Sequence, residues 1–398
     1  MLYKKNATVA KEMTLVADEM ILTADMPTTA GSRMLDGYRS LFSSEALLRL
    51  AGAGYELVGK VNVGEFGIDL LGESCYYGAT ERDGALALPA AAAIADGEAA
   101  AALVLDVNGA PTRGAAALGL TYVKPTYGTV SRYGVVPAAC SGDTVGVIAA
   151  CAEDCRRVLL AMAGHDDKDG TSLADDACRA AAESGKAPIA RVALATSLLD
   201  GVDAEMRAEV MATADALRRV GVEVVEVDAP LLAAAHEAWS ILMSAEVCNN
   251  VSRYDGVKFG YRADSFTSID ELYTNSRTEA FGELLKLCIL YGSDTLSTEN
   301  YSKVYDKALR VRRVVAEAFD ALFAEYGAVL LPTASKRRFG AEEAKAAPLA
   351  YRENRFTAPA MIAGLPSVVT QGVALVGAAF SEGALLDLAA RLEKEAKA

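Results

Sequence analysis

Histidine is scarce in this chain of 398 residues, which contains only His165 and His236. A Ser-His-Asp triad would need one of them, and neither belongs to a cluster with metal-ligand spacing. His165 lies among turn-forming residues, and His236 follows an alanine run that is typical of a helix. We interpret both as structural or solvated side chains. The sequence therefore predicts no histidine-based hydrolase, no metal site and no cofactor.

The sequence also lacks paired cysteines and long apolar runs. Its seven cysteines form no Cys-x-x-Cys motif, and an odd number argues against a disulfide framework. The N-terminus has no apolar core of signal-peptide length, and Asp96 and Glu98 interrupt the most apolar region. We therefore expect reduced thiols, a cytoplasmic location and no contact with a membrane.

Positive charge is in deficit, with 39 Lys and Arg against 53 Asp and Glu, a formal net charge of −14. Such a chain repels phosphate backbones, and its densest basic run, residues 336–338, is too short to offset this. We therefore expect no direct contact with nucleic acid. The apolar fraction of 52% is sufficient for a large core.

Hydrophobic periodicity predicts helices that alternate with strands. The expected helices are 43–54, 145–163, 203–220 and 295–326, and the expected strands are 56–63, 189–196, 222–227 and 328–332. This alternation indicates an α/β protein with a mixed or parallel sheet covered by helices. Residues 333–355 are mostly polar with little periodicity, and we expect a loop there.

Several short motifs occur in a fixed order along most of the chain. They are Thr28–Ser32, Gly59–Asn62, Glu65–Phe66, Lys124–Gly128, Val130–Gly134, Ala163–Asp166, Ser252–Gly256, Gly260–Arg262 and Ala363–Pro366. The ordered set resembles the amidase signature family, most closely the branch that contains the A subunit of the bacterial glutamyl/aspartyl-tRNA amidotransferases. This resemblance implies one large domain over residues 1–398, with helices on both faces of a mixed sheet. We expect the helical segment that precedes the family core to be absent and the tail after Pro366 to be short.

The resemblance also implies a Ser-Ser-Lys catalytic arrangement, in which a lysine and a bridging serine activate a nucleophilic serine. Lys60 occupies the lysine position, Leu86 the position of the bridging serine and Ala110 that of the nucleophile. The spacing between the two serine positions matches that of the family, and the nearby Asp106 and Gly109 are retained. Neither a leucine nor an alanine side chain can act as a nucleophile or carry a proton.

The amino-acid pocket implied by the resemblance is also altered. Asn354 stands at its acidic position, Cys288 at its arginine position, and Trp239 or Ser240 at its tyrosine position. We therefore predict a catalytically inactive scaffold that docks on a B-subunit-like partner, with a C-subunit-like partner also possible. The activity of the family branch would be that of a glutamine-hydrolysing glutaminyl-tRNA synthase, a ligase of protein biosynthesis.

Two other interpretations of the sequence stay open. The chain could be an active amidase or glutamine amidotransferase with a rearranged nucleophile near Lys60, for which Ser74, Cys75, Cys140 and Ser141 are candidates. It could instead be a free-standing pseudoenzyme that binds an apolar ligand in the altered cleft. As a relic, Lys60 would pair with Asp106 or Asp69, and we expect Lys60→Met to be neutral or mildly stabilising.

Overall fold

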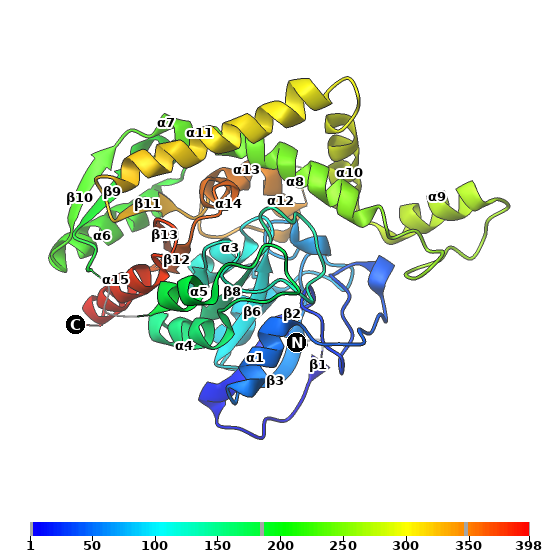
Figure 1. Ribbon diagram of the computed structural model, residues 1–398, viewed down its shortest axis with the longest axis horizontal. Helices are drawn as coiled ribbons and strands as arrows, with labels where there is room; N and C mark the ends of the chain where they lie inside the picture. The colour runs from blue at the N-terminus through cyan, green and yellow to red at the C-terminus, as the bar shows by residue number, and fades with distance from the viewer. Residues whose placement is uncertain (1–2, 184–186, 346–348, 398) are drawn as a thin grey trace.

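The computed structural model describes residues 3–183, 187–345 and 349–397. An 11-stranded mixed sheet runs through this part of the chain (Figure 1). In spatial order its strands are β1 (Tyr3–Lys4), β3 (Glu56–Val61), β2 (Thr14–Asp18), β6 (Ala101–Asp106), β8 (Thr144–Ala149), β7 (Thr121–Lys124), β12 (Ser367–Thr370), β13 (Val373–Val376), β11 (Ala328–Pro332), β9 (Arg191–Ala195) and β10 (Glu223–Val227). A separate ribbon joins β4 (Glu81–Arg82) and β5 (Ala85–Leu86).

Two groups of strands in this sheet are parallel, β3-β2-β6 and β11-β9-β10, and the remaining pairs are antiparallel. Every residue of the central strands β6 and β8 is buried. Strands covered on both faces need apolar residues throughout, which explains the continuous runs Ala101–Leu105 and Val145–Ala149. The predicted fold class, a single α/β domain with a mixed sheet, is confirmed.

Helices cover both faces of the sheet (Figure 1). They are α1 (Glu45–Gly52), α2 (Pro89–Ala95), α3 (Ala110–Ala117), α4 (Ala152–Met162), α5 (Asp175–Ala182), α6 (Ala204–Arg219), α7 (Pro230–Ala233), α8 (Ala235–Val251), α9 (Ile269–Ala280), α10 (Glu283–Thr295), α11 (Asp306–Phe323), α12 (Ala341–Ala344), α13 (Leu349–Glu353), α14 (Ala358–Ile362) and α15 (Glu382–Glu395). No helix among these described residues is long and apolar enough to cross a membrane.

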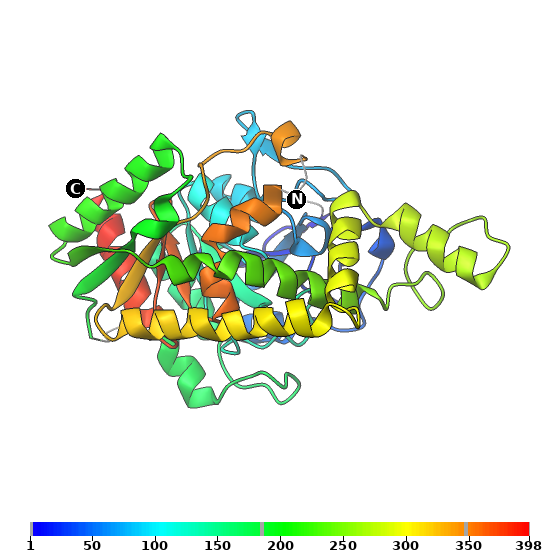
Figure 2. The ribbon, with the colours of Figure 1, turned by 90° about the horizontal axis from the view of Figure 1, so that it is seen from above.

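The helices of the second half form a layer beside the sheet. Figure 2 shows α11 along one side of the molecule with α8 next to it, and α9 standing out from the body. Helix α10 packs closely on α8, because a Cβ atom on Gly292 would lie only 2.1 Å from the carbonyl oxygen of Ser244. This layer carries several of the side chains predicted to form a binding pocket.

Capping residues explain where two of the predicted helices begin. The side chain of Ser44 accepts a hydrogen bond from the backbone N–H of Leu47 at the start of α1. Asp203 accepts one from Met206 at the start of α6. Both residues satisfy N–H groups that the first turn of a helix leaves without a backbone partner. Both helices lie within the ranges predicted for them.

The prediction of a helix over 145–163 is wrong in its first part. Residues 144–149 form strand β8, and the helix α4 begins only at Ala152. The run Thr144-Val145-Gly146-Val147-Ile148 is rich in β-branched residues, which favour strands. Because this strand is buried on both faces, it shows no alternation that would separate it from a buried helix.

The segment 333–355 is not one continuous loop. Residues 333–340 are irregular, but helices α12 and α13 follow and residues 354–356 form a 3₁₀ turn. These elements are each five residues or shorter, too short for a period of 3.6 residues to be visible in the sequence.

Candidate active site

Three parallel strands end at the same edge of the sheet. β2 ends at Asp18, β3 at Val61 and β6 at Asp106, so the residues around these positions converge. In open α/β sheets, ligands bind outside the carboxyl ends of the strands. This edge also receives Lys60 from β3 and the turn that leads from β6 into α3. We take this edge as the candidate site and describe the other predicted residues by their position relative to it.

Lys60 is fully buried at this edge. Its ammonium nitrogen donates to the carbonyl oxygens of Ile21, at 2.8 Å, and Pro27, at 3.0 Å. It also donates to the hydroxyl oxygen of Thr28 at 2.7 Å, and Glu19 Oε1 lies 3.8 Å away. A lysine ammonium has three hydrogens, and all three are used here. The arrangement holds the charged form of the lysine.

Burial and neighbouring carboxylates act on the pKa of Lys60 in opposite directions. Burial lowers the pKa to about 8, although Glu19 and Asp18 raise it. Burial also raises the pKa of Glu19, and it raises the pKa of Asp18 to about 7. Two carboxyl groups and one ammonium group thus share a small buried volume, and each depends on the others for its charge.

The expected partners of this lysine have other contacts. Asp106 accepts a hydrogen bond from the backbone N–H of Gly109 at 2.7 Å and another from the Tyr122 hydroxyl at 2.9 Å. Asp69 accepts from the backbone N–H and the hydroxyl of Ser74, both at 2.8 Å. The expected pairing with Asp106 or Asp69 is therefore wrong, because these carboxylates satisfy backbone turns of their own.

Asp18 and Glu19 also belong to this site, although no motif in the sequence singled them out. Asp18 ends β2 and accepts hydrogen bonds from the backbone N–H groups of Met20, at 2.9 Å, and Leu105, at 2.8 Å. Glu19 accepts from the N–H of Thr29 at 2.7 Å. A signal was present, since two consecutive acidic residues at the end of a buried strand need partners.

The turn from β6 into α3 contains the position predicted for the nucleophile. Gly109 caps the helix in the left-handed region, at φ 80°, and Ala110 is its first residue. A Cβ atom on Gly109 would lie 2.4 Å from the hydroxyl oxygen of Thr357. Only glycine fits both this backbone conformation and this close approach. Ala110 is buried, with 6% of its surface exposed.

Leu86 lies in the short strand β5 and is also buried. Its backbone N–H donates to the carbonyl oxygen of Phe339 at 2.8 Å. Two residues further on, the side chain of Leu88 lies against α3, where a Cβ atom on Gly114 would come within 2.4 Å of it. The structure therefore brings the segments 84–90 and 105–117 together, with aliphatic side chains at positions 86 and 110.

The positions assigned to the amino-acid pocket lie in the layer formed by α8, α10 and the turn after α13. The Asn354 side-chain amide donates to the Ser240 hydroxyl oxygen at 3.1 Å. The indole N–H of Trp239 donates to the side-chain oxygen of Asn108 at 3.3 Å, next to the Gly109 turn. Trp239 and Asn354 are both fully buried, so their assignment to an amino-acid pocket stays a prediction.

Cys288 lies apart from those contacts, beside the hydroxyl of Tyr351. This hydroxyl also hydrogen-bonds that of Ser244 at 2.8 Å. Burial raises the pKa of the Cys288 thiol to about 11. The thiol is therefore protonated at neutral pH and bound within a small hydroxyl network.

Of the four candidates for a rearranged nucleophile, the two serines are engaged elsewhere and the two cysteines are weakly reactive. The Ser74 hydroxyl donates to Asp69, and that of Ser141 donates to Glu246 Oε1 at 2.5 Å. Burial raises the pKa of the Cys75 thiol to about 11 and also raises that of Cys140. A thiol with a raised pKa holds little of the reactive thiolate. The hydroxyl found beside Lys60 is that of Thr28, which belongs to one of the family-like motifs but was not among these candidates.

Comparison with known proteins assigns the chain to a family. A family model described as Amidase matches residues 18–386. The chain belongs to the amidase signature family. Among curated relatives it is 32% identical to the A subunit of the glutamyl-tRNA(Gln) amidotransferase of Streptococcus pneumoniae, covering 95% of this chain and 82% of that protein. The corresponding subunit of Agathobacter rectalis is 34% identical, covering 94% and 78%.

Solved structures agree with this assignment. The chain superposes on the A subunit of the glutamyl-tRNA(Gln) amidotransferase of Thermotoga maritima with a TM-score of 0.80 and 25% identity. The match covers 98% of this chain and 86% of that one. The prediction of a catalytically inactive scaffold is contradicted by these relatives. They are named as amidotransferase subunits, and the match covers most of their length. Their likeness supports an amidotransferase subunit and gives no sign of an inactive branch.

Proposed function

We propose that this chain is the A-subunit-like component of an amidotransferase and works in a complex with a B-subunit-like partner. The observation that carries the proposal is the extent of the likeness, which covers 95% of this chain at 32% identity to one such A subunit. The proposal extends this likeness from the fold and the order of motifs to the surfaces through which subunits assemble. In this assembly the chain takes part in protein biosynthesis as part of a ligase, and a C-subunit-like chain is a further partner.

The chemistry of the complex centres, in this proposal, on the carboxyl edge of β2, β3 and β6. Lys60 supplies a buried ammonium there, and Thr28 supplies a hydroxyl 2.7 Å from it. Positions 86 and 110, which resemble the family's serine positions, have no hydroxyl. In this proposal, proton transfer at this edge therefore uses the cluster around Lys60.

The proposal places the chain in the cytoplasm, where aminoacyl-tRNA is used. All seven cysteines are unpaired, which fits a reducing compartment. The acidic surface implied by the net charge of −14 leaves the contact with tRNA to the partner.

The test is to express the chain together with the B-subunit-like and C-subunit-like chains of the same genome. We expect a stoichiometric complex by size-exclusion chromatography with light scattering. The complex should also transfer an amide nitrogen to the acceptor aminoacyl-tRNA, measured in parallel with glutamine and with ammonium chloride as the nitrogen donor.

The two donors separate assembly from amide cleavage. Transfer from ammonium reports the assembled complex, and the ratio of the two rates reports how much ammonia this chain releases from glutamine. A chain that forms no complex with either partner, or a complex that transfers nitrogen from neither donor, would contradict the proposed function.

A further inference from the structure

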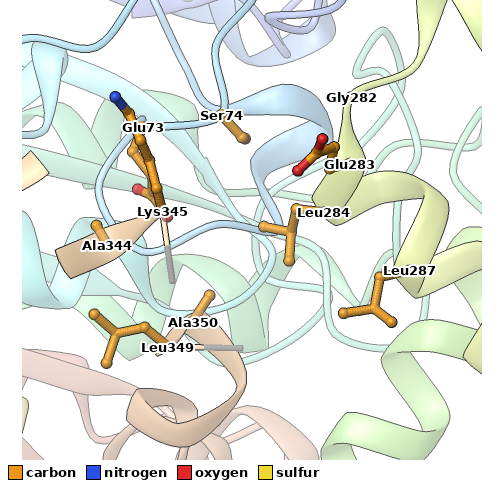
Figure 3. A pocket seen from close by; sticks show the side chains of 10 residues that line it. All are labelled: Glu73, Ser74, Gly282, Glu283, Leu284, Leu287, Ala344, Lys345, Leu349 and Ala350. Carbon is orange, nitrogen blue, oxygen red and sulfur yellow. The ribbon is translucent and has the colours of Figure 1, made fainter. Parts of the chain in front are cut away.

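Three segments that are far apart in the sequence enclose a cavity of about 460 Å³ (Figure 3). The segments are the loop before Cys75, the start of α10 and the pair of short helices α12 and α13. The lining residues that determine its chemistry are Glu73, Glu283, Leu284, Leu287, Lys345 and Leu349. Sites for small ligands usually have volumes of about 300–1,000 Å³, so this cavity has the size of a small-molecule site.

The two sides of this cavity differ in chemistry. Figure 3 shows Glu73 and Glu283 along its upper side and Leu349 along its lower side. Leu284 and Leu287 of α10 complete the apolar wall. Leu287 keeps 40% of its surface exposed, which is high for a leucine and leaves an aliphatic face uncovered. A ligand that fits must be aliphatic on one side.

The carboxyl group of Glu73 determines the character of the polar side. Its two oxygens accept hydrogen bonds from the backbone N–H groups of Leu70 and Leu71, both at 2.9 Å. These bonds fix the carboxyl group at the cavity wall. Burial and the nearby carboxylate of Asp69 raise the pKa of Glu73 to about 8. Ionisation of Glu73 is therefore unfavourable unless a positive charge approaches it.

Positive charge near the cavity is already engaged. Arg113 of α3 donates to the carbonyl oxygens of Asp69 and Leu70, on the far side of the loop. Lys345, which lines the cavity, donates to Glu342 at 2.7 Å, and Lys286 donates to the carbonyl oxygen of Thr278 at 2.7 Å.

Carboxyl groups are more numerous by comparison. Glu283 stands on the rim, and Glu65 lies beneath the start of α10, where it accepts the backbone N–H of Gly282 at 2.8 Å. Together with Glu73 and Asp69, they outnumber the cations around the cavity. A ligand that brings a positive charge would favour the ionised form of these groups.

We propose that this cavity binds a primary alkylamine in its ammonium form, with the charged group between Glu73 and Glu283 and a short alkyl chain along Leu284 and Leu287. The ammonium group offers three hydrogen-bond donors to carboxylate oxygens, which retain lone pairs for them. The alkyl chain covers the aliphatic face on α10. This inference does not depend on the proposed amidotransferase function.

The pH dependence of binding follows from the same contacts. Asp69 in its own loop and Arg113 from α3 act on the charge of Glu73, and Glu283 from α10 and Lys345 directly after α12 line the same cavity. Binding of an ammonium group favours ionised Glu73, so a proton leaves Glu73 as the amine binds. Because alkylamines stay protonated up to about pH 10, the affinity should rise between about pH 6 and pH 9.

The experiment is isothermal titration calorimetry of the full chain with pentylamine, and with pentanol and pentanoate as probes of the same length. We expect pentylamine to bind at least about tenfold more tightly than pentanol, as one additional ion pair predicts, and pentanoate not to bind. Methylamine should bind more weakly than pentylamine, because it covers none of the aliphatic wall.

Three variants assign the binding to this cavity. Glu73→Gln should weaken pentylamine binding at least about tenfold and remove its pH dependence. Leu287→Ser, at an exposed position that tolerates change, should reduce the difference between pentylamine and methylamine. Glu317→Gln, which removes an exposed carboxylate on α11, is the control and should change nothing.

Three outcomes would overturn the inference. They are the absence of heat with pentylamine, equal affinity for pentylamine and pentanol, and unchanged binding in both cavity variants. If Glu73→Gln does not fold, Glu283→Gln on the exposed rim replaces it, with the same expected loss of affinity for the amine and no loss for pentanol.

Discussion

Lys60 connects two parts of the chain through its side chain. It belongs to β3, yet its three donated hydrogen bonds all go to residues 21–28, which follow β2. Two of the acceptors are backbone carbonyl groups that are buried with it. A buried carbonyl group without a donor is costly, so the lysine stabilises the path of this segment as well as the Glu19 carboxylate.

This arrangement reverses the expectation for Lys60→Met. The methionine would fill a similar volume, but it would leave the Glu19 carboxylate without its nearby positive charge, and Thr28 and two carbonyl groups without their donor. Removing one partner of a buried ion pair costs about 3–5 kcal/mol. We therefore expect Lys60→Met to lower the free energy of unfolding by about that amount, measured by urea denaturation.

A matched control separates this effect from the loss of a positive charge in an acidic protein. Lys303 is 68% exposed and pairs with Glu299 at 3.8 Å on the surface. Lys303→Met should change the free energy of unfolding by less than about 0.5 kcal/mol. If the two substitutions changed the free energy of unfolding equally, the buried contacts of Lys60 would not contribute to stability.

At the scale of elements, the turn between β6 and α3 has a strict requirement. Gly109 has φ 80° and lies against Thr357, and its N–H donates to Asp106. Gly109→Ala adds a methyl group where backbone conformation and space both exclude it. We expect a loss of about 1–3 kcal/mol in the free energy of unfolding.

Gly340 provides the control for that substitution. It also precedes a helix, but its φ is −76° and nothing lies within 4 Å of where a Cβ atom would stand. Gly340→Ala should stay within about 0.5 kcal/mol of the parent protein in the same thermal or chemical unfolding experiment. A destabilisation of Gly340→Ala as large as that of Gly109→Ala would contradict the steric explanation.

The sequence predicted elements where their periodicity or capping was strong. Helix α6, with Asp203 as its cap, and strand β11 both lie within their predicted ranges. Strand β8 was missed because a strand buried on both faces shows no alternation. The helices α12 and α13 were missed because they are too short to show a period.

The candidate site was predictable only in part, for a different reason. The position of Lys60 at a strand end followed from local pattern, and the order of motifs indicated the family. Its partner Glu19 did not follow, because that contact depends on how the chain turns back after β2. The short-range contact between Asp106 and Gly109 was likewise hidden, since Asp106 is separated from its helix by a turn of unusual backbone conformation.

At the scale of the whole molecule, the described chain contains many buried carboxyl groups. Burial raises the pKa of Asp18 and Glu65 to about 7, that of Glu73 to about 8 and that of Asp143 to about 6. In the unfolded chain such groups have pKa values near 4. At pH values between the unfolded and the folded pKa of a group, the folded state therefore binds more protons than the unfolded state does.

The sign of the pH dependence follows from this difference. A carboxyl group whose pKa is higher in the folded state contributes its full stabilisation at pH values below its pKa in the unfolded chain. That contribution is lost as the pH rises through its pKa in the folded state. The pKa of Lys60 and that of Lys124 are both lowered to about 8, so these lysines stay charged in both states below that pH and contribute little slope there. The carboxyl groups therefore dominate between about pH 5 and pH 8.

We accordingly expect the free energy of unfolding to fall by about 2 kcal/mol or more from pH 5 to pH 8, measured by urea denaturation at each pH. Repulsion within a chain of net charge −14 would act in the same direction, but salt screens it. The fall should therefore persist in about 1 M sodium chloride, where only the buried groups still respond. Asp18→Asn, which cannot ionise, should make the fall shallower. A stability that is constant or rises over this range, or a fall that salt abolishes, would mean that these carboxyl groups are already ionised in the folded protein.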